Sequence, residues 1–286
     1  MPDAPTPASV DRDLARRIEA AEATTAMLYA ETLKRLRPGT AAVAERIAGG
    51  AAVYAGIGSP LTRAGGLGLE GPVTVVEIER LEQFYRSRGI EARLEVSPLA
   101  DPSLFDLLGR RGYRLTGFSN LLARPLVRGD APLPAPSSGV STRRVTPEGA
   151  ETWARTVAQG FFDPEPVSPA LMGTFAPFCE LPGATCFLAL VDDRVAGGGA
   201  LAIQERVAIL LGGSTLAPCR GRGAHSALIL ARLALAVERG CDLATLSASP
   251  GGVAQRNAER LGFRVLYTRA RMALDHRGGG EILLHY

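Results

Sequence analysis

Residues 207–240 read VAILLGGSTLAPCRGRGAHSALILARLALAVERG. The run that opens this stretch is apolar, short and followed by turn residues, so we predict a buried strand over residues 207–216. A turn with two glycines follows at 217–223, and good helix formers then run over 224–239 until Gly240, which ends the helix. The stretch therefore predicts a strand, a glycine-rich turn and a helix in direct succession.

The turn before this helix predicts a site for an anion. The first amides of a helix have no partner inside it and lie at the positive end of the helix dipole. Gly221 and Gly223 can adopt a positive φ and carry no Cβ that would hold a phosphate away, and Arg220 and Arg222 add charge beside them. The turn has neither the P-loop pattern nor the dinucleotide-binding pattern with its later acid, which excludes those two phosphate sites.

The turn resembles the acyl-CoA pyrophosphate loop of the GNAT N-acetyltransferase superfamily, Arg/Gln-x-x-Gly-x-Gly/Ala. Here the loop is Arg220-Gly221-Arg222-Gly223-Ala224-His225. The resemblance implies that this loop and the next residue, Ser226, bind the pyrophosphate. His225 stands where the superfamily has a small residue: its imidazole either points away and leaves the site open, or points inward and narrows it. A tight strand-to-helix connection without a ligand is the alternative.

A second match lies downstream, in residues 242–272. A strand at 243–247 leads to a helix with Asn257-Ala258-Glu259-Arg260, then to Leu261-Gly262-Phe263 and a last strand. GNAT proteins typically carry such a helix followed by Leu-Gly-Phe. Gly262 also ends a helix and Phe263 is a core aromatic, so these two need no catalytic role.

The remainder of the second half predicts a mixed sheet with helices. We expect strands at 140–144, 185–191 and 195–203, and helices at 147–159 and 168–180. With the two motifs the order is β-α-α-β-β-β-α-β-α-β, which is also the order of a GNAT domain.

The first half looks like a second copy of this domain. We expect helices at 11–37, 40–47 and 73–88 and strands at 51–57 and 92–96. Ser97 and Ser247 stand 150 residues apart, as do Gly112-Tyr113-Arg114 and Gly262-Phe263-Arg264. The fold class is therefore α/β, with two tandem GNAT-like domains, each a twisted mixed sheet flanked by helices. The domains are 1–130 and 138–286, joined by the Pro- and Ser-rich linker 131–137.

The first domain resembles a GNAT copy that has lost its cofactor loop. The corresponding segment is Leu67-Gly68-Leu69-Glu70-Gly71-Pro72, which has an acid where a pyrophosphate would need positive charge. We expect no CoA binding there. In tandem GNAT proteins the degenerate half generally shapes or covers the acceptor pocket.

The resemblance implies acyl transfer from acetyl-CoA to an amine. Pantetheine would pair with the backbone of Ser214, Thr215 and Leu216, as an added strand. Tyr267 and Asn257 are the candidate catalytic residues. Ala258 stands where many relatives have a tyrosine that acts as general acid for the leaving thiolate, and Gly251 stands where many have an asparagine. For a base, Glu180, Glu205 and a water held by Ser247 or Ser249 stay open, as does transfer without a dedicated base.

Composition excludes several classes of protein. With 46% hydrophobic and 21% charged residues and a net charge of +3, the chain is typical of a globular protein without a nucleic-acid surface. No apolar run is long enough for a membrane span, and the start lacks the pattern of a secretory signal. The four cysteines and three histidines show no metal-ligand spacing. We expect a cytoplasmic protein with reduced thiols, no metal and no membrane partner.

The leading hypothesis is a direct-transfer N-acetyltransferase that uses acetyl-CoA and a small-molecule or peptide amine. The alternative is a non-catalytic acyl-CoA-binding or interaction module, which the missing tyrosine at Ala258 favours. A third hypothesis, an aminoacyl-tRNA donor, is disfavoured by the small net charge. The sequence does not indicate an oligomeric state.

Overall fold

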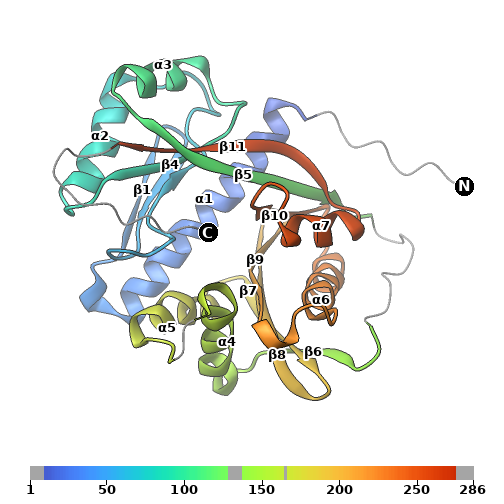
Figure 1. Cartoon of the computed structure of the whole chain (residues 1–286). Helices are drawn as coiled ribbons and strands as arrows, with labels where there is room; N and C mark the ends of the chain where they lie inside the picture. The colour runs from blue at the N-terminus through green and yellow to red at the C-terminus, as the bar shows by residue number, and fades with distance from the viewer. Residues whose placement is uncertain (1–9, 128–136, 164–165, 275–286) are drawn as a thin grey trace, which may run out of the picture. The chain divides into compact units, whose positions relative to one another are not determined.

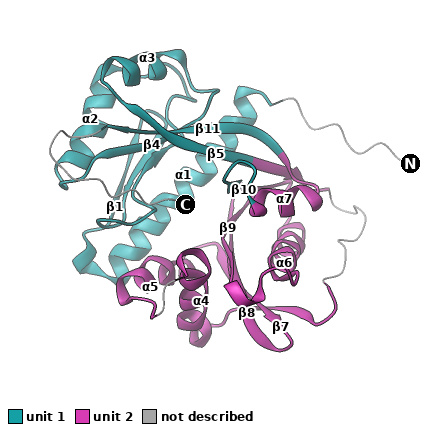
Figure 2. Ribbon diagram, viewed as in Figure 1, with its two compact units in different colours: residues 1–121, 247–252, 265–286 teal, residues 122–246, 253–264 magenta. Residues whose placement is uncertain are grey.

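The computed structural model describes residues 10–127, 137–163 and 166–274 (Figure 1). The chain divides into two compact units (Figure 2). Unit 1 comprises residues 1–121, 247–252 and 265–286, and unit 2 comprises residues 122–246 and 253–264. The expected linker at 131–137 lies outside the described residues except for Ser137.

Unit 1 contains a sheet in the order β1-β2-β3-β4-β11-β5. Its helices are α1 (Arg12–Leu36), α2 (Val75–Arg86) and α3 (Pro102–Arg110), and its strands are β1 (Val43–Ile47), β2 (Gly50–Tyr54), β3 (Ala64–Gly65), β4 (Ala92–Val96), β11 (Arg264–Leu274) and most of β5 (Arg114–Pro125). Strand β3 pairs in parallel with β4, whereas β11 pairs antiparallel with β4, from Ala270 opposite Val96 to Leu274 opposite Ala92. This pairing places the last described strand in unit 1, which differs from the expectation of a second domain that runs to residue 286.

The predicted short helix over residues 40–47 is wrong. A 3₁₀ turn at Pro38–Thr40 is followed by the strand β1, which pairs antiparallel with β2. Ala48 and Gly49 connect the two strands and both have a positive φ, of 48° and 80°. Two such residues in succession form the tight hairpin turn that matches strand twist, so hairpin pairing overrides the local helix preference.

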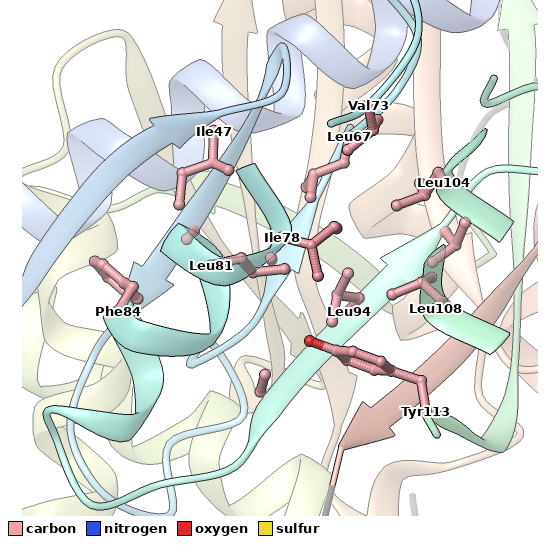
Figure 3. Packing of buried hydrophobic residues seen from close by; sticks show 14 of the residues in the cluster. Ile47, Leu67, Val73, Ile78, Leu81, Phe84, Leu94, Leu104, Leu108 and Tyr113 are labelled. Atoms are coloured by element: carbon pink, nitrogen blue, oxygen red, sulfur yellow. The ribbon is translucent and has the colours of Figure 1, made fainter. Parts of the chain in front are cut away.

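The core of unit 1 lies between α2, α3 and the sheet (Figure 3). Ile78, Leu81 and Phe84 follow one face of α2, and Leu104 and Leu108 follow one face of α3. They are buried with residues of the strands, among them Ile47 and Leu94. Helical spacing of apolar residues explains both helices, and α2 lies within the helix predicted at 73–88.

Unit 2 contains a sheet in the order β10-β9-β8-β7-β6. Its strands are β6 (Val140–Arg144), β7 (Ala184–Val191), β8 (Arg194–Gln204), β9 (Val207–Thr215) and β10 (Leu243–Ala248), and its helices are α4 (Ala150–Phe162), α5 (Pro169–Phe175), α6 (Ala224–Glu238) and α7 (Val253–Arg260). The predicted helix at 168–180 is interrupted, because α5 gives way to a 3₁₀ turn at Ala176–Cys179 that contains Pro177. The other predicted elements of this half are confirmed within a few residues.

Helices α4 and α6 cover opposite faces of this sheet (Figure 1). A Cβ added to Gly198 would meet Val157 and Trp153 of α4, whereas a Cβ added to Gly199 would meet Arg232 of α6. Successive residues of a strand point to opposite faces, so the two helices must lie on different sides. The indole of Trp153 is fully buried and donates to the carbonyls of Phe187 and Gly199 at 3.1 and 3.3 Å.

The repeat inferred from the sequence is present in the order of elements. Helix α2, strand β4, helix α3 and strand β5 follow one another in the first half, as α6, β10, α7 and β11 do in the second. Gly112 and Gly262, each just before the last strand of its set, have φ values of 79° and 85°. Both halves therefore use a glycine to turn from a helix into a strand.

Candidate cofactor site

Strand β9 has a long edge that β10 does not cover. The parallel pairs between the two strands run from Leu243 opposite Val207 to Thr245 opposite Ile209. Strand β9 continues to Thr215, and over those further residues its described partner is β8. Backbone groups on such an edge are available to an extended ligand.

This part of β9 contains a bulge made of two glycines. Gly198 pairs with Ser214, and Ala200 pairs with Leu211, so Gly212 and Gly213 stand opposite the single residue Gly199. Gly212 has a φ of 57°, which other residues rarely adopt. The bulge bends the strand at the start of its uncovered edge.

The helix after β9 begins without a side-chain cap. Its N-cap is Gly223, with a φ of 89°, and no side chain accepts from the first-turn amides. Gly221 has a φ of 78°, and a Cβ added there would meet no atom within 4 Å, whereas one on Gly223 would lie 2.7 Å from Ser137 Oγ. The amides of Ala224, His225 and Ser226 therefore face a turn with room for an anion, as a pyrophosphate requires.

The two arginines of the loop bind protein groups on either side of the turn. Arg220 donates through Nε to the carbonyl of Thr215 at 3.4 Å and through Nη2 to that of Gly160 at 3.3 Å. Arg222 forms an ion pair with Asp192, Nη2 to Oδ2, at 2.5 Å. Both arginines are exposed, so water keeps these contacts weak and an anion can compete for the guanidinium groups.

The three residues expected to pair with pantetheine differ in their availability. Both backbone groups of Leu216 are engaged, because its N–H donates to Ala196 and its carbonyl accepts from Cys219. Ser214 is buried and its hydroxyl donates to Val157 at 3.2 Å. Thr215 Oγ1 is buried without a hydrogen-bond partner in the part of the chain that the structure describes. The prediction that backbone groups pair with pantetheine therefore rests on Ser214 and Thr215.

The imidazole of His225 points inward, against β9. Its Nε2 lies 3.3 Å from the point where a Cβ of Gly213 would stand, and its Nδ1 lies 3.4 Å from the side-chain nitrogen of Asn257. Burial and, less, the charge of Arg232 lower the pKa of His225 to about 4, so the ring is neutral at neutral pH. Of the two orientations that the sequence left open, this is the one that narrows the site.

Tyr267, the candidate acid, belongs to unit 1 and lies in a buried polar cluster. Its hydroxyl donates to Glu19 at 3.0 Å, and Arg269 donates to the same carboxylate at 2.7 Å. Burial and the nearby Glu19 raise the pKa of Tyr267. The catalytic role of Tyr267 stays a prediction, as does that of Asn257.

The candidate bases are spread over the surface. Glu180 and Glu205 are exposed, and Glu205, with a φ of 45°, lies in the tight turn between β8 and β9 that the sequence predicts. Ser247 and Ser249 are exposed too, and Ser247 accepts a hydrogen bond from Arg269 at 3.2 Å.

Among the described residues, no three His, Cys, Asp or Glu side chains come together as a metal site would require. No described helix combines the length and apolar character needed to span a bilayer.

Comparison with known proteins shows what the second half resembles. Residues 152–263 match the model of the Acetyltransferase (GNAT) family. A GCN5-related N-acetyltransferase from Kribbella flavida has the same fold, with a TM-score of 0.62, 20% identity, and coverage of 93% of this chain and 96% of that one. No curated protein matches the chain.

Two further solved structures extend this likeness. A GCN5-related N-acetyltransferase from Sphaerobacter thermophilus gives a TM-score of 0.56 at 19% identity, covering 72% of this chain and 69% of the other. A tandem GNAT protein from the clavulanic acid biosynthesis pathway gives a TM-score of 0.55 at 17% identity, covering 72% of this chain and 70% of the other. The mixed α/β fold and its tandem arrangement are therefore those of GNAT proteins.

Proposed function

We propose, from the match of residues 152–263 to the GNAT acetyltransferase family model, that this chain transfers an acetyl group directly from acetyl-CoA to an amine. One observation carries the proposal: the uncapped start of α6 lies behind a glycine turn and next to the uncovered edge of β9. An anion site and an edge for an extended group are the two features that a pyrophosphate and its pantetheine arm need.

Different residues of unit 2 would bind the pyrophosphate and the pantetheine arm of acetyl-CoA. The amides of Ala224, His225 and Ser226 would hold the pyrophosphate, and the open side of Gly221 would admit it, while Gly223 gives the turn its positive φ. Arg220 and Arg222 would add charge after exchanging their present partners. The backbone of Ser214 and Thr215 would pair with pantetheine, with the unpartnered hydroxyl of Thr215 close by.

The reaction needs little covalent chemistry from the protein. The amine nitrogen attacks the thioester carbon, the new C–N bond forms as the C–S bond breaks, and the electron pair stays on sulfur. The ammonium proton leaves to water or a base, and the thiolate is protonated to free CoA. Holding the two reactants in line supplies much of the acceleration.

Unit 1 is proposed not to bind CoA. Helix α2 follows the degenerate segment, and Thr74 caps it: its hydroxyl accepts from the amide of Glu77 at 3.3 Å, while Glu77 accepts from the Thr74 amide at 2.8 Å. These contacts satisfy amides that a phosphate would need, and the exposed Glu70 would repel it. We therefore expect one acetyl-CoA per chain.

The acceptor is proposed to be a small-molecule or peptide amine, without nucleic acid or membrane as partner. The small net charge of +3 supports this, since nucleic-acid surfaces are strongly basic. All four cysteines are free thiols, which supports the proposed cytoplasmic location.

Release of free thiol from acetyl-CoA tests the proposed activity. Purified protein is given acetyl-CoA and a panel of diamines, amino sugars, amino acids and peptides, and the thiol is followed with a chromogenic disulfide. We expect at least one amine to raise the rate about a hundredfold over acetyl-CoA alone, as positioning of two reactants allows. Binding of acetyl-CoA with no amine-dependent release would instead establish the non-catalytic alternative, which the fully buried Ala258 favours.

A further inference from the structure

A buried arginine lies under the bulge of β9. Arg232 of α6 is only 2% exposed. Its Nε donates to the carbonyl of Leu228 at 2.9 Å, and its Nη1 donates to those of Ala200 and Leu211 at 3.2 and 3.1 Å. Ala200 and Leu211 are the pair at which the regular register resumes beside the bulge. The guanidinium therefore holds both strands at this point.

Among the residues that the structure describes, no opposite charge lies beside the positive charge of Arg232. Within the described ranges no carboxylate forms an ion pair with it, and the titratable groups near it are His225 and Cys186. Burial raises the pKa of the Cys186 thiol and lowers that of His225 to about 4, so both are neutral at neutral pH. Burial likewise lowers the pKa of Arg232, to about 9. An unpaired buried cation lowers stability, and hydrogen bonds to carbonyls offset only part of this.

Two glycines make room for this side chain. A Cβ on Gly199 would lie 3.0 Å from Cζ of Arg232, and a Cβ on Gly213 would lie 3.3 Å from its Nη2. The Nε2 of His225 approaches the same point of Gly213, also at 3.3 Å. The third nitrogen of the guanidinium is thus directed at the bulge, where the uncovered edge of β9 begins.

The bulge is where the reactive end of the donor would lie, an assignment that rests on the proposed function. A pyrophosphate at the start of α6 lies near the end of β9, after Thr215. An arm that follows the uncovered edge from Thr215 toward Ile209 reaches Gly213 and Gly212 next. The thioester would then lie at the bulge of β9, beside the backbone to which Arg232 donates its hydrogen bonds.

We propose that Arg232 is a positioning residue whose unpaired charge stabilises the negative charge that sulfur acquires when the C–S bond of the donor breaks. It acts through the bulge: its bonds to Ala200 and Leu211 fix the backbone that meets the donor, and its charge lies in surroundings of low polarity. A buried cation without a partner has an electrostatic effect there that a surface cation would lack.

Titration of CoA bound to the protein tests this inference. The product CoA carries the free thiol, and its ionisation is followed by the ultraviolet absorbance of the thiolate, as the difference between protein with CoA and protein alone. In the wild type we expect the bound thiol to ionise about one to two pH units below free CoA, because a nearby cation favours the charged form. Arg232→Gln should restore the value of free CoA, whereas Arg232→Lys should keep most of the shift.

Kinetics and a control variant separate this role from a structural one. With an active amine, Arg232→Gln should lower kcat about a hundredfold and change KM for acetyl-CoA less than about threefold. Arg155→Gln removes the same charge from the surface of α4, where Arg155 pairs with Glu151, and should change neither value. The titration of CoA bound to the wild-type protein tests the inference even if the variants of Arg232 do not fold.

The outcomes are distinct. CoA that binds to the wild type with an unshifted thiol, or a shift that Arg232→Gln preserves, overturns the role of Arg232 and leaves the proposed function standing. No binding of CoA to the wild type overturns the proposed function and this inference with it.

Discussion

Gly221→Ala is expected to weaken acetyl-CoA binding by about a hundredfold, which corresponds to roughly 2.7 kcal/mol. The added methyl would project into space that no protein atom occupies within 4 Å, in the turn before the uncapped start of α6. A pyrophosphate held away from these amides loses charge-assisted hydrogen bonds of about 1.5–3 kcal/mol each. Isothermal titration calorimetry at fixed ionic strength measures the change.

Gly240→Ala is the matched control for this variant. Gly240 follows the other end of α6, has a φ of 74° against 78° for Gly221, and a Cβ there would also meet no atom within 4 Å. Both substitutions therefore impose a similar backbone strain of about 1–2 kcal/mol. Equal affinity in the two variants would show that strain, and not the loop, determines binding.

Arg269→Met is expected to lower the free energy of unfolding by about 3–5 kcal/mol at pH 7. In unit 1 the Nε of Arg269 lies 2.7 Å from Glu19 Oε1, and its Nη2 lies 2.8 Å from Glu22 Oε2. The side chains of Arg269 and Glu19 are 2% and 4% exposed, so the variant leaves a buried carboxylate unpaired. Denaturant unfolding followed by circular dichroism measures the loss.

The pH dependence gives this prediction a second check. Burial raises the pKa of Glu22 although Arg269 opposes this, so removal of Arg269 should raise it further. A carboxyl whose pKa is higher in the folded state adds stability at low pH and loses it as pH rises through the folded value. The deficit of Arg269→Met should therefore shrink below about pH 5.

A surface variant provides the comparison. Arg16 pairs with Asp13 at 3.0 Å, with side chains 52% and 81% exposed, so Arg16→Met should cost less than about 0.5 kcal/mol. A loss below about 1 kcal/mol in Arg269→Met, or one that does not change with pH, would contradict the importance of the buried cluster.

Local patterns predict much of the fold and the loop. The segment from β9 through Gly221 and Gly223 to α6 is contiguous in the sequence. Its apolar residues, glycines and helix formers therefore determine the local structure without help from distant residues. The repeat at a separation of 150 residues is also visible in the sequence, because it rests on identical or similar residues at matching positions. The order predicted for the second half, from β6 to β11, is confirmed.

Contacts between distant residues limit what the sequence predicts. In the sequence Arg232 is only one charged residue in a run of helix formers, because nothing local shows the glycines at 199 and 213 that make room for it. Glu19 of α1 and Arg269 of β11 are 250 positions apart, and only the packing of the helix against the sheet brings them together. The hairpin at β1 depends likewise on its partner β2, which is why a helix was predicted there.

Titration of the wild-type chain and of Arg220→Glu with acetyl-CoA tests the central claim most directly. Arg220 lies at the end of β9, bound to the carbonyls of Thr215 and Gly160, and a carboxylate there would repel the pyrophosphate. We expect one site per chain in the wild type and none measurable in the variant, with both proteins folded by circular dichroism. Two sites, or equal affinity in the variant, would contradict a single cofactor site at the start of α6.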